Sequence, residues 1–195
     1  MKKNGMNFLD VKSSEELLDF VLNHRLAFDE FVKLLELDDE RAINAYLQKN
    51  YLTVEEEAYL LEKAKLCYAG TYFAVSALSF KGQEFLMTKC KPEVVEEYVR
   101  YNDLNEEFEK LLFREGLEKA ALIYVAHNCL FSSSEIPMME FGGVRMVERY
   151  IEHDDLRKPA EFKLLEEPYR KLIPTYLSKW NMCPEVEHQY RSQVG

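Results

Sequence analysis

The sequence is poor in helix-breaking residues and has no long apolar run. Only seven of its 195 residues are glycine and six are proline, fewer than the turns of an all-β fold would require. The most apolar stretch, residues 120–126, is much shorter than the roughly 18 residues of a membrane span. The first ten residues, MKKNGMNFLD, carry two lysines but no apolar segment behind them, so we expect no signal peptide. These absences favour a helical protein without a membrane partner.

Cysteine pairs are absent as well. Cys67, Cys90, Cys129 and Cys183 are widely separated, and none of them forms a CxxC motif. Scattered single cysteines in a chain without a signal peptide are typical of a reducing compartment. We therefore expect four reduced thiols and a cytoplasmic location.

Positive charge is scarce. Asp and Glu total 35 against 25 Lys and Arg, which gives a formal net charge of −10, and no basic cluster exceeds two adjacent residues. Nucleic-acid binding depends on a Lys/Arg surface that neutralises phosphates. The composition therefore excludes a nucleic-acid partner and favours a basic protein or peptide.

What the chain does contain is a repeat of 26 residues. An aromatic–apolar–x–x–x–x–Leu pattern starts at Phe20 as FVLNHRL and recurs without insertion or deletion. It reads YLQKNYL from 46, YFAVSAL from 72, YVRYNDL from 98, YVAHNCL from 124, YIEHDDL from 150 and YLSKWNM from 176. A fixed period of this kind is the signature of stacked units, each of which buries its apolar side against its neighbours.

Apolar residues that recur in the same frame predict the core. One such column contains Leu34, Leu60, Leu86, Leu112, Met138 and Leu164, and another contains Ile43, Ala69, Val95, Ala121, Val147 and Ile173. The aromatic column from Phe20 to Tyr176 is also expected in the core, with each tyrosyl hydroxyl reaching the rim.

Each unit has room for two helices of about ten residues. The first is predicted at positions such as 54–63 and 106–115, and the second at positions such as 92–101. Helix starts are indicated by S/T-x-x-E capping boxes (Thr53 with Glu56, Ser132 with Glu135), by Asn105 at a cap position, and by Pro92 and Pro184 in first turns.

Helix ends are indicated by a second group of residues. Gly116, Gly142-Gly143 and Pro168 fall between predicted helices, as expected for helix-ending positions. Asn50, Asn102, Asn128 and Asp154 share one repeat position, where a left-handed residue would end the second helix. A polar ridge that binds ligands is the other interpretation of these four.

These elements predict one domain over residues 1–195, an all-α solenoid with the right-handed α-α superhelix of such folds. It comprises about six helical hairpins whose repeats start at 20, 46, 72, 98, 124, 150 and 176. We expect a flexible N-terminus over 1–12, a capping helix within 13–26 that Ser13 and Glu16 open, and a short final helix near 186–190.

Two sequence blocks carry a resemblance. They are YVRYNDL at 98–104 and EKLLFREG at 109–116, and related blocks extend over roughly residues 13–190. The unit resembles bacterial tandem-repeat proteins of short helical hairpins, broadly HEAT-like or related to leucine-rich repeat variants. This resemblance implies a protein-binding scaffold without a cofactor; the iron–sulfur cysteine cluster of the leucine-rich repeat variants is absent here.

Few residues suggest chemistry. His127 and His153 occupy one repeat position, beside Asp154 and Asp155, and a metal site built from stacked units would use such ligands. Histidine near a helix end is also favoured by the helix dipole. The serines at 132–134 lack a G-x-S-x-G elbow. We therefore expect no metal, no cofactor and no catalytic residues.

A binding surface is predicted where polar residues vary on the fixed frame, at positions 3, 4 and 6 of the aromatic heptapeptide. The candidates are Arg100, Tyr101, Asp103, His127, Glu152, His153, Asp155 and Lys179. A protein-interaction scaffold is the function that this favours. The alternatives are a structural module that oligomerises through its C-terminal repeat at 176–190, and a ligand- or metal-binding enzyme.

Overall fold

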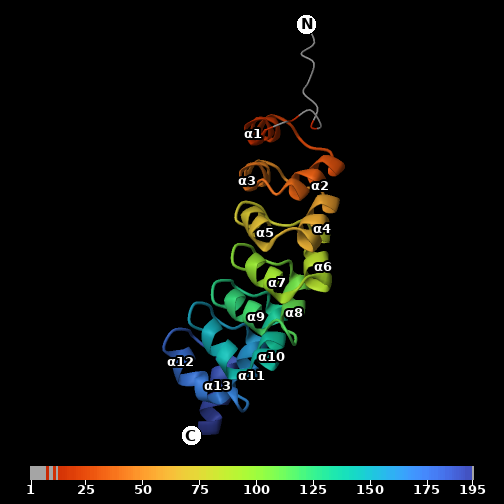
Figure 1. Ribbon diagram of the computed structural model, residues 1–195. Coiled ribbons are helices and arrows are strands. Elements are labelled where there is room, and N and C mark those ends of the chain that lie inside the picture. The colour runs from red at the N-terminus through yellow and green to blue at the C-terminus, as the bar shows by residue number, and fades with distance from the viewer. Residues whose placement is uncertain (1–7, 9–10, 12, 195) are drawn as a thin grey trace. The chain divides into compact units, whose positions relative to one another are not determined.

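The computed structural model describes residues 8, 11 and 13–194, and this part of the chain is helical. It forms thirteen α-helices and no β-strand (Figure 1). The prediction of an all-α protein is confirmed. None of the described helices is long and apolar enough to cross a lipid bilayer. The predicted flexible terminus, 1–12, lies outside the described residues except for Phe8 and Val11.

The chain divides into two compact units, with the boundary between Asn102 and Asp103. The first unit contains α1 (Ser14–Asn23), α2 (Phe28–Leu37), α3 (Glu40–Lys49), α4 (Val54–Lys63), α5 (Leu66–Phe73), α6 (Phe80–Lys89) and α7 (Pro92–Tyr98). Here α1, α3, α5 and α7 pack one against the next, and α2, α4 and α6 form a second row (Figure 1). The single repeat domain stays a prediction.

The second unit contains α8 (Glu106–Leu112), α9 (Glu118–Val125), α10 (Ser132–Tyr150), α11 (Lys158–Leu164), the 3-10 helix η2 (Tyr169–Leu172), α12 (Ile173–Leu177) and α13 (Pro184–Val194). Within it α10 packs against α8, α9 and α11. At Gly143 the backbone leaves the helical region with φ 59° and ψ −158°, which glycine tolerates because it has no Cβ. The expected break at Gly142-Gly143 therefore lies inside α10.

Most predicted helix starts are confirmed. Thr53 and Glu56 form the capping box of α4, and the Ser13 hydroxyl accepts the Glu16 N–H at 3.2 Å. Pro92 begins α7 and Pro184 begins α13. The prediction of a capping box at Ser132 and Glu135 is wrong.

The start of α10 differs because its N-cap is Phe131 and not a serine. The Glu135 carboxylate accepts a backbone N–H from Arg157, so it does not turn back to its own helix. A contact across 22 residues has replaced the local one.

Helices end earlier than the repeat suggests. The helix predicted at 106–115 ends at Leu112, and the one predicted at 92–101 ends at Tyr98. The predicted left-handed cap is also wrong. Asn50 caps α3 at φ −120°, and its side-chain amide donates to the Tyr46 carbonyl at 2.9 Å. Because the amide satisfies this carbonyl itself, no left-handed turn is needed; among the described non-glycine residues only Asp38 has a positive φ.

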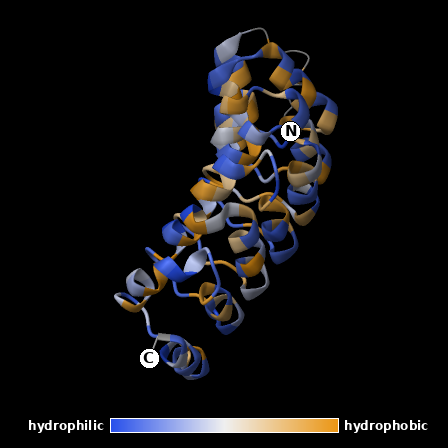
Figure 2. Cartoon of the chain, turned by 90° about the horizontal axis from the view of Figure 1, so that it is seen from below, coloured by the Kyte–Doolittle hydropathy of each residue, from blue (hydrophilic) through white to orange (hydrophobic). Residues whose placement is uncertain are grey.

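The predicted core columns are confirmed. Leu34, Leu60, Leu86, Leu112 and Leu164 are each at most 1% exposed, and so are the six tyrosines Tyr46, Tyr72, Tyr98, Tyr124, Tyr150 and Tyr176. Polar and apolar residues alternate along the helices, as the hydropathy colouring in Figure 2 shows. Each helix therefore buries one apolar side within its unit, and its polar side remains outside.

Candidate functional site

The residues predicted to bind a partner lie in the connections that follow the second helix of each hairpin. In the first unit Arg100 and Tyr101 come after the end of α7 at Tyr98. Tyr101 is 54% exposed, and Arg100 pairs with Glu97 at 3.5 Å. The prediction that Arg100 and Tyr101 lie on the helix is wrong, because α7 ends at Tyr98, three residues before the predicted end at 101.

In the second unit the same connections carry the other candidates. His127 follows α9, Lys179 follows α12, and Glu152, His153 and Asp155 follow α10. All are exposed except His153, which is half-buried with its ring edge-on to Tyr150 at 5.7 Å. Asp103 is exposed at the start of the unit. His127, Glu152, His153, Asp155 and Lys179 therefore line a series of turns, which we call the turn edge, residues 126–131, 151–157 and 178–183.

Some of these candidates are brought together. The Lys179 ammonium donates to the Glu152 carbonyl at 3.3 Å, and the Glu152 carboxylate pairs with Arg149 at 2.5 Å. Asp155 pairs with Arg157 at 2.9 Å. No hydrogen bond of the described side chains joins His127 to this group.

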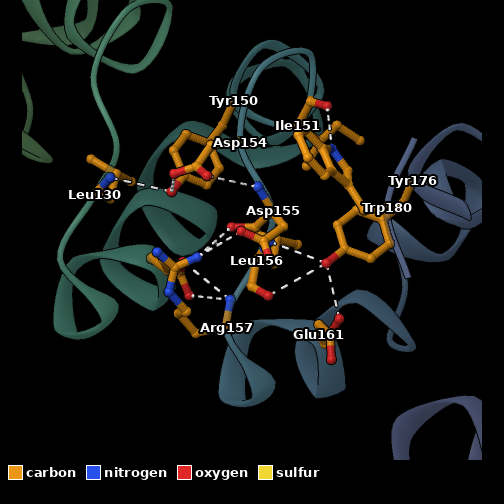
Figure 3. A network of polar contacts seen from close by, with 11 residues as sticks. Leu130, Tyr150, Ile151, Asp154, Asp155, Leu156, Arg157, Glu161, Tyr176 and Trp180 are labelled. Atoms are coloured by element: carbon orange, nitrogen blue, oxygen red, sulfur yellow. Dashed lines mark hydrogen bonds and ion pairs between the residues drawn. The ribbon is translucent and has the colours of Figure 1, made fainter. Parts of the chain in front are cut away.

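Buried tyrosines hold the turn edge from beneath. The Leu130 N–H donates to the Tyr150 hydroxyl at 3.2 Å, and the Leu156 N–H donates to the Tyr176 hydroxyl at 3.1 Å (Figure 3). The same contact joins Leu104 to Tyr124, and in the first unit it joins Leu26 to Tyr46 and Leu52 to Tyr72. Each tyrosine thus satisfies a buried backbone donor in the turn 20 residues before it.

Buried carboxylates form the second support. Glu109 accepts the Phe131 N–H at 2.9 Å, and Glu161 accepts the Cys183 N–H at 2.9 Å. Glu135 accepts the Arg157 N–H through both oxygens, at 3.1 and 2.9 Å. All three are at most 3% exposed. The three donors stand at the starts of α10, α11 and α13, where a helix leaves its first N–H groups unsatisfied.

Burial affects the charge of these groups. It raises the pKa of Glu135 to about 7, although the backbone N–H and the charge of Arg157 act in the opposite direction. Burial likewise raises the pKa of Glu109 against its hydrogen bonds from the Phe131 N–H and the Tyr124 hydroxyl. Glu109 and Glu135 are thus held by donors in sites that disfavour their ionised forms.

Sequence reasoning missed these carboxylates. In the first unit Glu57 accepts from the Ser79 N–H at 2.9 Å, and the Gln83 amide donates to the Tyr98 hydroxyl at 3.1 Å. The signal was available, because one repeat position reads Glu57, Gln83, Glu109, Glu135 and Glu161. An acid or amide that recurs inside an apolar frame is typical of a buried polar contact.

Trp180 also escaped notice. Its indole N–H donates to the Ile151 carbonyl at 2.9 Å, and this contact joins the turn after α12 to the turn after α10 (Figure 3). In the first unit Asn102, at the same repeat position, donates to the Phe73 carbonyl at 2.8 Å. Neighbouring turns of a unit are therefore bound to each other as well as to the core.

Two candidate chemical sites of the sequence, the histidines and the serines, can be located in the structure. Within residues 8, 11 and 13–194, no three His, Cys, Asp or Glu side chains are placed to hold a metal ion. The hydroxyl of Ser133 donates to Glu106 at 2.5 Å in an exposed position. The geometry of the turn edge is that of a fixed polar surface.

Comparisons of the chain with protein-family models, with curated proteins and with solved structures found no match. Its function is therefore inferred from its own residues.

Proposed function

We propose that the chain is a short α-solenoid of the HEAT-like, hairpin-repeat kind that binds a protein or peptide partner without catalysis. The support is the recurrence of contacts at fixed separations: 20 residues from turn N–H to tyrosyl hydroxyl, and 22 residues from carboxylate to helix-start N–H. Recurring contacts of this kind are expected when equivalent units stack. Four free thiols are consistent with a reducing, cytoplasmic setting.

The turn edge is the surface that we assign to binding. Its backbone is fixed by Tyr150, Tyr176, Glu135 and Glu161 from beneath, while its outward side chains remain exposed. A surface that is already ordered loses little conformational entropy on binding, and affinity gains accordingly. This anchoring is the single observation that carries the proposal.

The partner that fits best is basic. The chain carries a net charge of −10, which attracts a positively charged protein over a distance. On the turn edge Glu152 and Asp155 are exposed acids whose charges are already shared with arginines. We therefore assign the charge a steering role and the turn edge the specificity.

Alanine variants test the surface. After affinity capture from the native host and mass spectrometry have supplied a partner, binding is measured by calorimetry for His127→Ala and His153→Ala on the turn edge, and for Tyr101→Ala, the exposed candidate of the first unit. We expect weaker binding, with a melting temperature lowered by no more than a few degrees. Glu84→Ala on the exposed side of α6 serves as control.

The opposite pattern would contradict the choice of surface. If the three variants bind as the wild type does, and changes on α2, α4 or α6 abolish binding, the partner docks on the first helices of the hairpins.

A further inference from the structure

In the first unit, a slot between neighbouring hairpins is filled by three residues. The Tyr68 hydroxyl donates to Asp38 at 2.6 Å, and Lys65 forms an ion pair with the same carboxylate. The Lys65 ammonium also lies over the Tyr68 ring, 5.9 Å from its centroid. Here the turn between α2 and α3 meets the turn between α4 and α5, and the remaining cavity has about 290 Å³.

One repeat further along, the same slot is open. At the repeat positions of Tyr68 and Asp38, the next repeat has Val94 and Ala64. The position of Lys65 keeps its lysine, as Lys91. The two substitutions remove an aromatic ring and a carboxylate from the space between the turns. The cavity there has about 650 Å³, more than twice that of its neighbour and within the range of small-molecule sites.

The walls of this larger cavity are mainly apolar. Leu60, Leu61 and Ala69 are buried, and Phe85 and Val94 are half-buried at its sides. Cys90 also lines it, and burial raises the pKa of this thiol to about 11. An apolar body can therefore be covered on several sides.

The rim carries two lysines and two acids. Lys89 and Lys91 line the cavity, and neither ammonium has an ion-pair partner among the described residues. Of the two acids in the lining, Glu62 is paired with Lys63 at 2.7 Å, so two lysines and one acid, Glu93, remain outside the ion pairs of the described residues. Lys65, the counterpart of Lys91, is neutralised by Asp38, whereas the carboxylate that would neutralise Lys91 is replaced by the methyl group of Ala64.

We propose that this cavity is a binding site for a small amphipathic organic acid, with the apolar body between the turns and the carboxylate on Lys89 and Lys91. The missing ring of Tyr68 corresponds to the body of the ligand, and the missing carboxylate of Asp38 corresponds to its head group. This inference goes beyond the proposed partner binding, because it concerns different residues and a different class of ligand.

Decanoate is the probe, titrated into the full chain by calorimetry below its micelle concentration. The expected result is saturable binding of one molecule per chain. Decyltrimethylammonium, which has the same chain length and the opposite charge, should bind at least about ten-fold more weakly because it meets the two lysines. No saturable binding of decanoate, or equal binding of the cation, would overturn the proposal.

The double variant Ala64→Asp/Val94→Tyr closes the cavity with the residues that fill the neighbouring slot. We expect it to melt no lower than the wild type and to lose decanoate binding by more than about ten-fold. Unchanged binding in a folded double variant would place decanoate elsewhere and overturn the proposal.

Two single variants keep the test decisive if the double variant does not fold. Lys91→Met changes an exposed side chain and should weaken decanoate about five-fold, as for a partly exposed ion pair. Val94→Phe narrows the cavity and should weaken decanoate binding by more than Lys91→Met does. Lys171→Met, exposed in the second unit, is the matched control and should bind as the wild type does. Equal affinity in all three variants would overturn the proposal.

Discussion

Individual residues in this protein bring carboxylates into the core beneath exposed turns. Glu109, Glu135 and Glu161 are at most 3% exposed, yet each accepts a backbone N–H from the start of a helix 22 residues further along the chain. Burying a charge is costly unless hydrogen-bond donors surround it. The positive end of a helix dipole offsets part of that cost. Burial raises the pKa of Glu109 and of Glu135, so the protonation of these two groups is linked to folding.

Glu135 makes this linkage measurable. Burial raises its pKa from an ordinary 4.5 to about 7, so between these pH values the folded protein holds a proton that the unfolded chain releases. Its contribution to stability is present below about pH 4.5 and is lost as the pH rises through 7, by up to about 3 kcal/mol. Glu135→Gln removes the titration. We expect the unfolding free energy of the variant, relative to wild type, to increase across this window.

Urea denaturation at several pH values between 4.5 and 8 gives the comparison. Gln83 shows that an amide is accommodated at this repeat position. Glu148→Gln, exposed on the same helix, is the control and should give a difference that does not change with pH in this way. If Glu135→Gln behaves like Glu148→Gln, the pKa of Glu135 is not raised by burial.

The tyrosyl hydroxyls give a second prediction. Tyr176→Phe leaves the Leu156 N–H without its acceptor and Glu161 without one of its donors. Loss of a buried partner costs about 1–3 kcal/mol, and we expect this decrease in unfolding free energy in urea. Tyr51→Phe, at a side chain 83% exposed, should change it by less than about 0.5 kcal/mol. Equal effects of the two substitutions would mean that the Tyr176 hydroxyl does not contribute to the free energy of unfolding.

The elements themselves are too short to be stable alone. Helices of seven residues, such as α8 and α11, are well below the length at which isolated helices persist. Their stability must come from the apolar side that each one packs against its neighbours. A single deep truncation should therefore affect the whole unit.

Neighbouring leucines on α8 test this dependence. Leu112 is fully buried, whereas Leu111 is 39% exposed. Leu112→Ala should lower the unfolding free energy by about 2–5 kcal/mol, the usual range for buried large-to-small changes. Leu111→Ala should cost much less. Thermal or urea denaturation measures both, and equal losses would show that burial at Leu112 does not carry the stability of α8.

Local signals decided how well these elements were predicted from sequence. Thr53 is the N-cap of α4 and Glu56 lies in its first turn, so their local pattern gave the helix start correctly. Ser132 and Glu135 have the same pattern, but the Glu135 carboxylate accepts a hydrogen bond from the Arg157 backbone N–H instead of one from its own helix. The binding residues were displaced from helix to turn for a similar reason, since α7 ends at Tyr98 and the repeat alone does not fix that boundary.

The molecule as a whole carries a formal charge of −10, and this leads to a prediction for its association with a partner. Attraction between an acidic chain and a basic protein raises the association rate and is screened by salt. We expect the association rate to fall several-fold between 50 and 500 mM NaCl, while the dissociation rate changes less. Stopped-flow or surface-binding kinetics with the captured partner give both rates. An association rate that does not depend on salt would exclude electrostatic steering.

The sequence by itself determined that the protein is helical and which apolar and tyrosine columns are buried. Spacing sufficed for this, because leucines and tyrosines that recur at one repeat position must share one environment wherever equivalent helices pack. Only the tertiary structure decided which acids are buried and which slot is open. Glu135 reaches a donor 22 residues away, and the cavity beside Val94 is bounded by four helices and their turns. Such contacts depend on how one hairpin lies against the next, which no local pattern encodes.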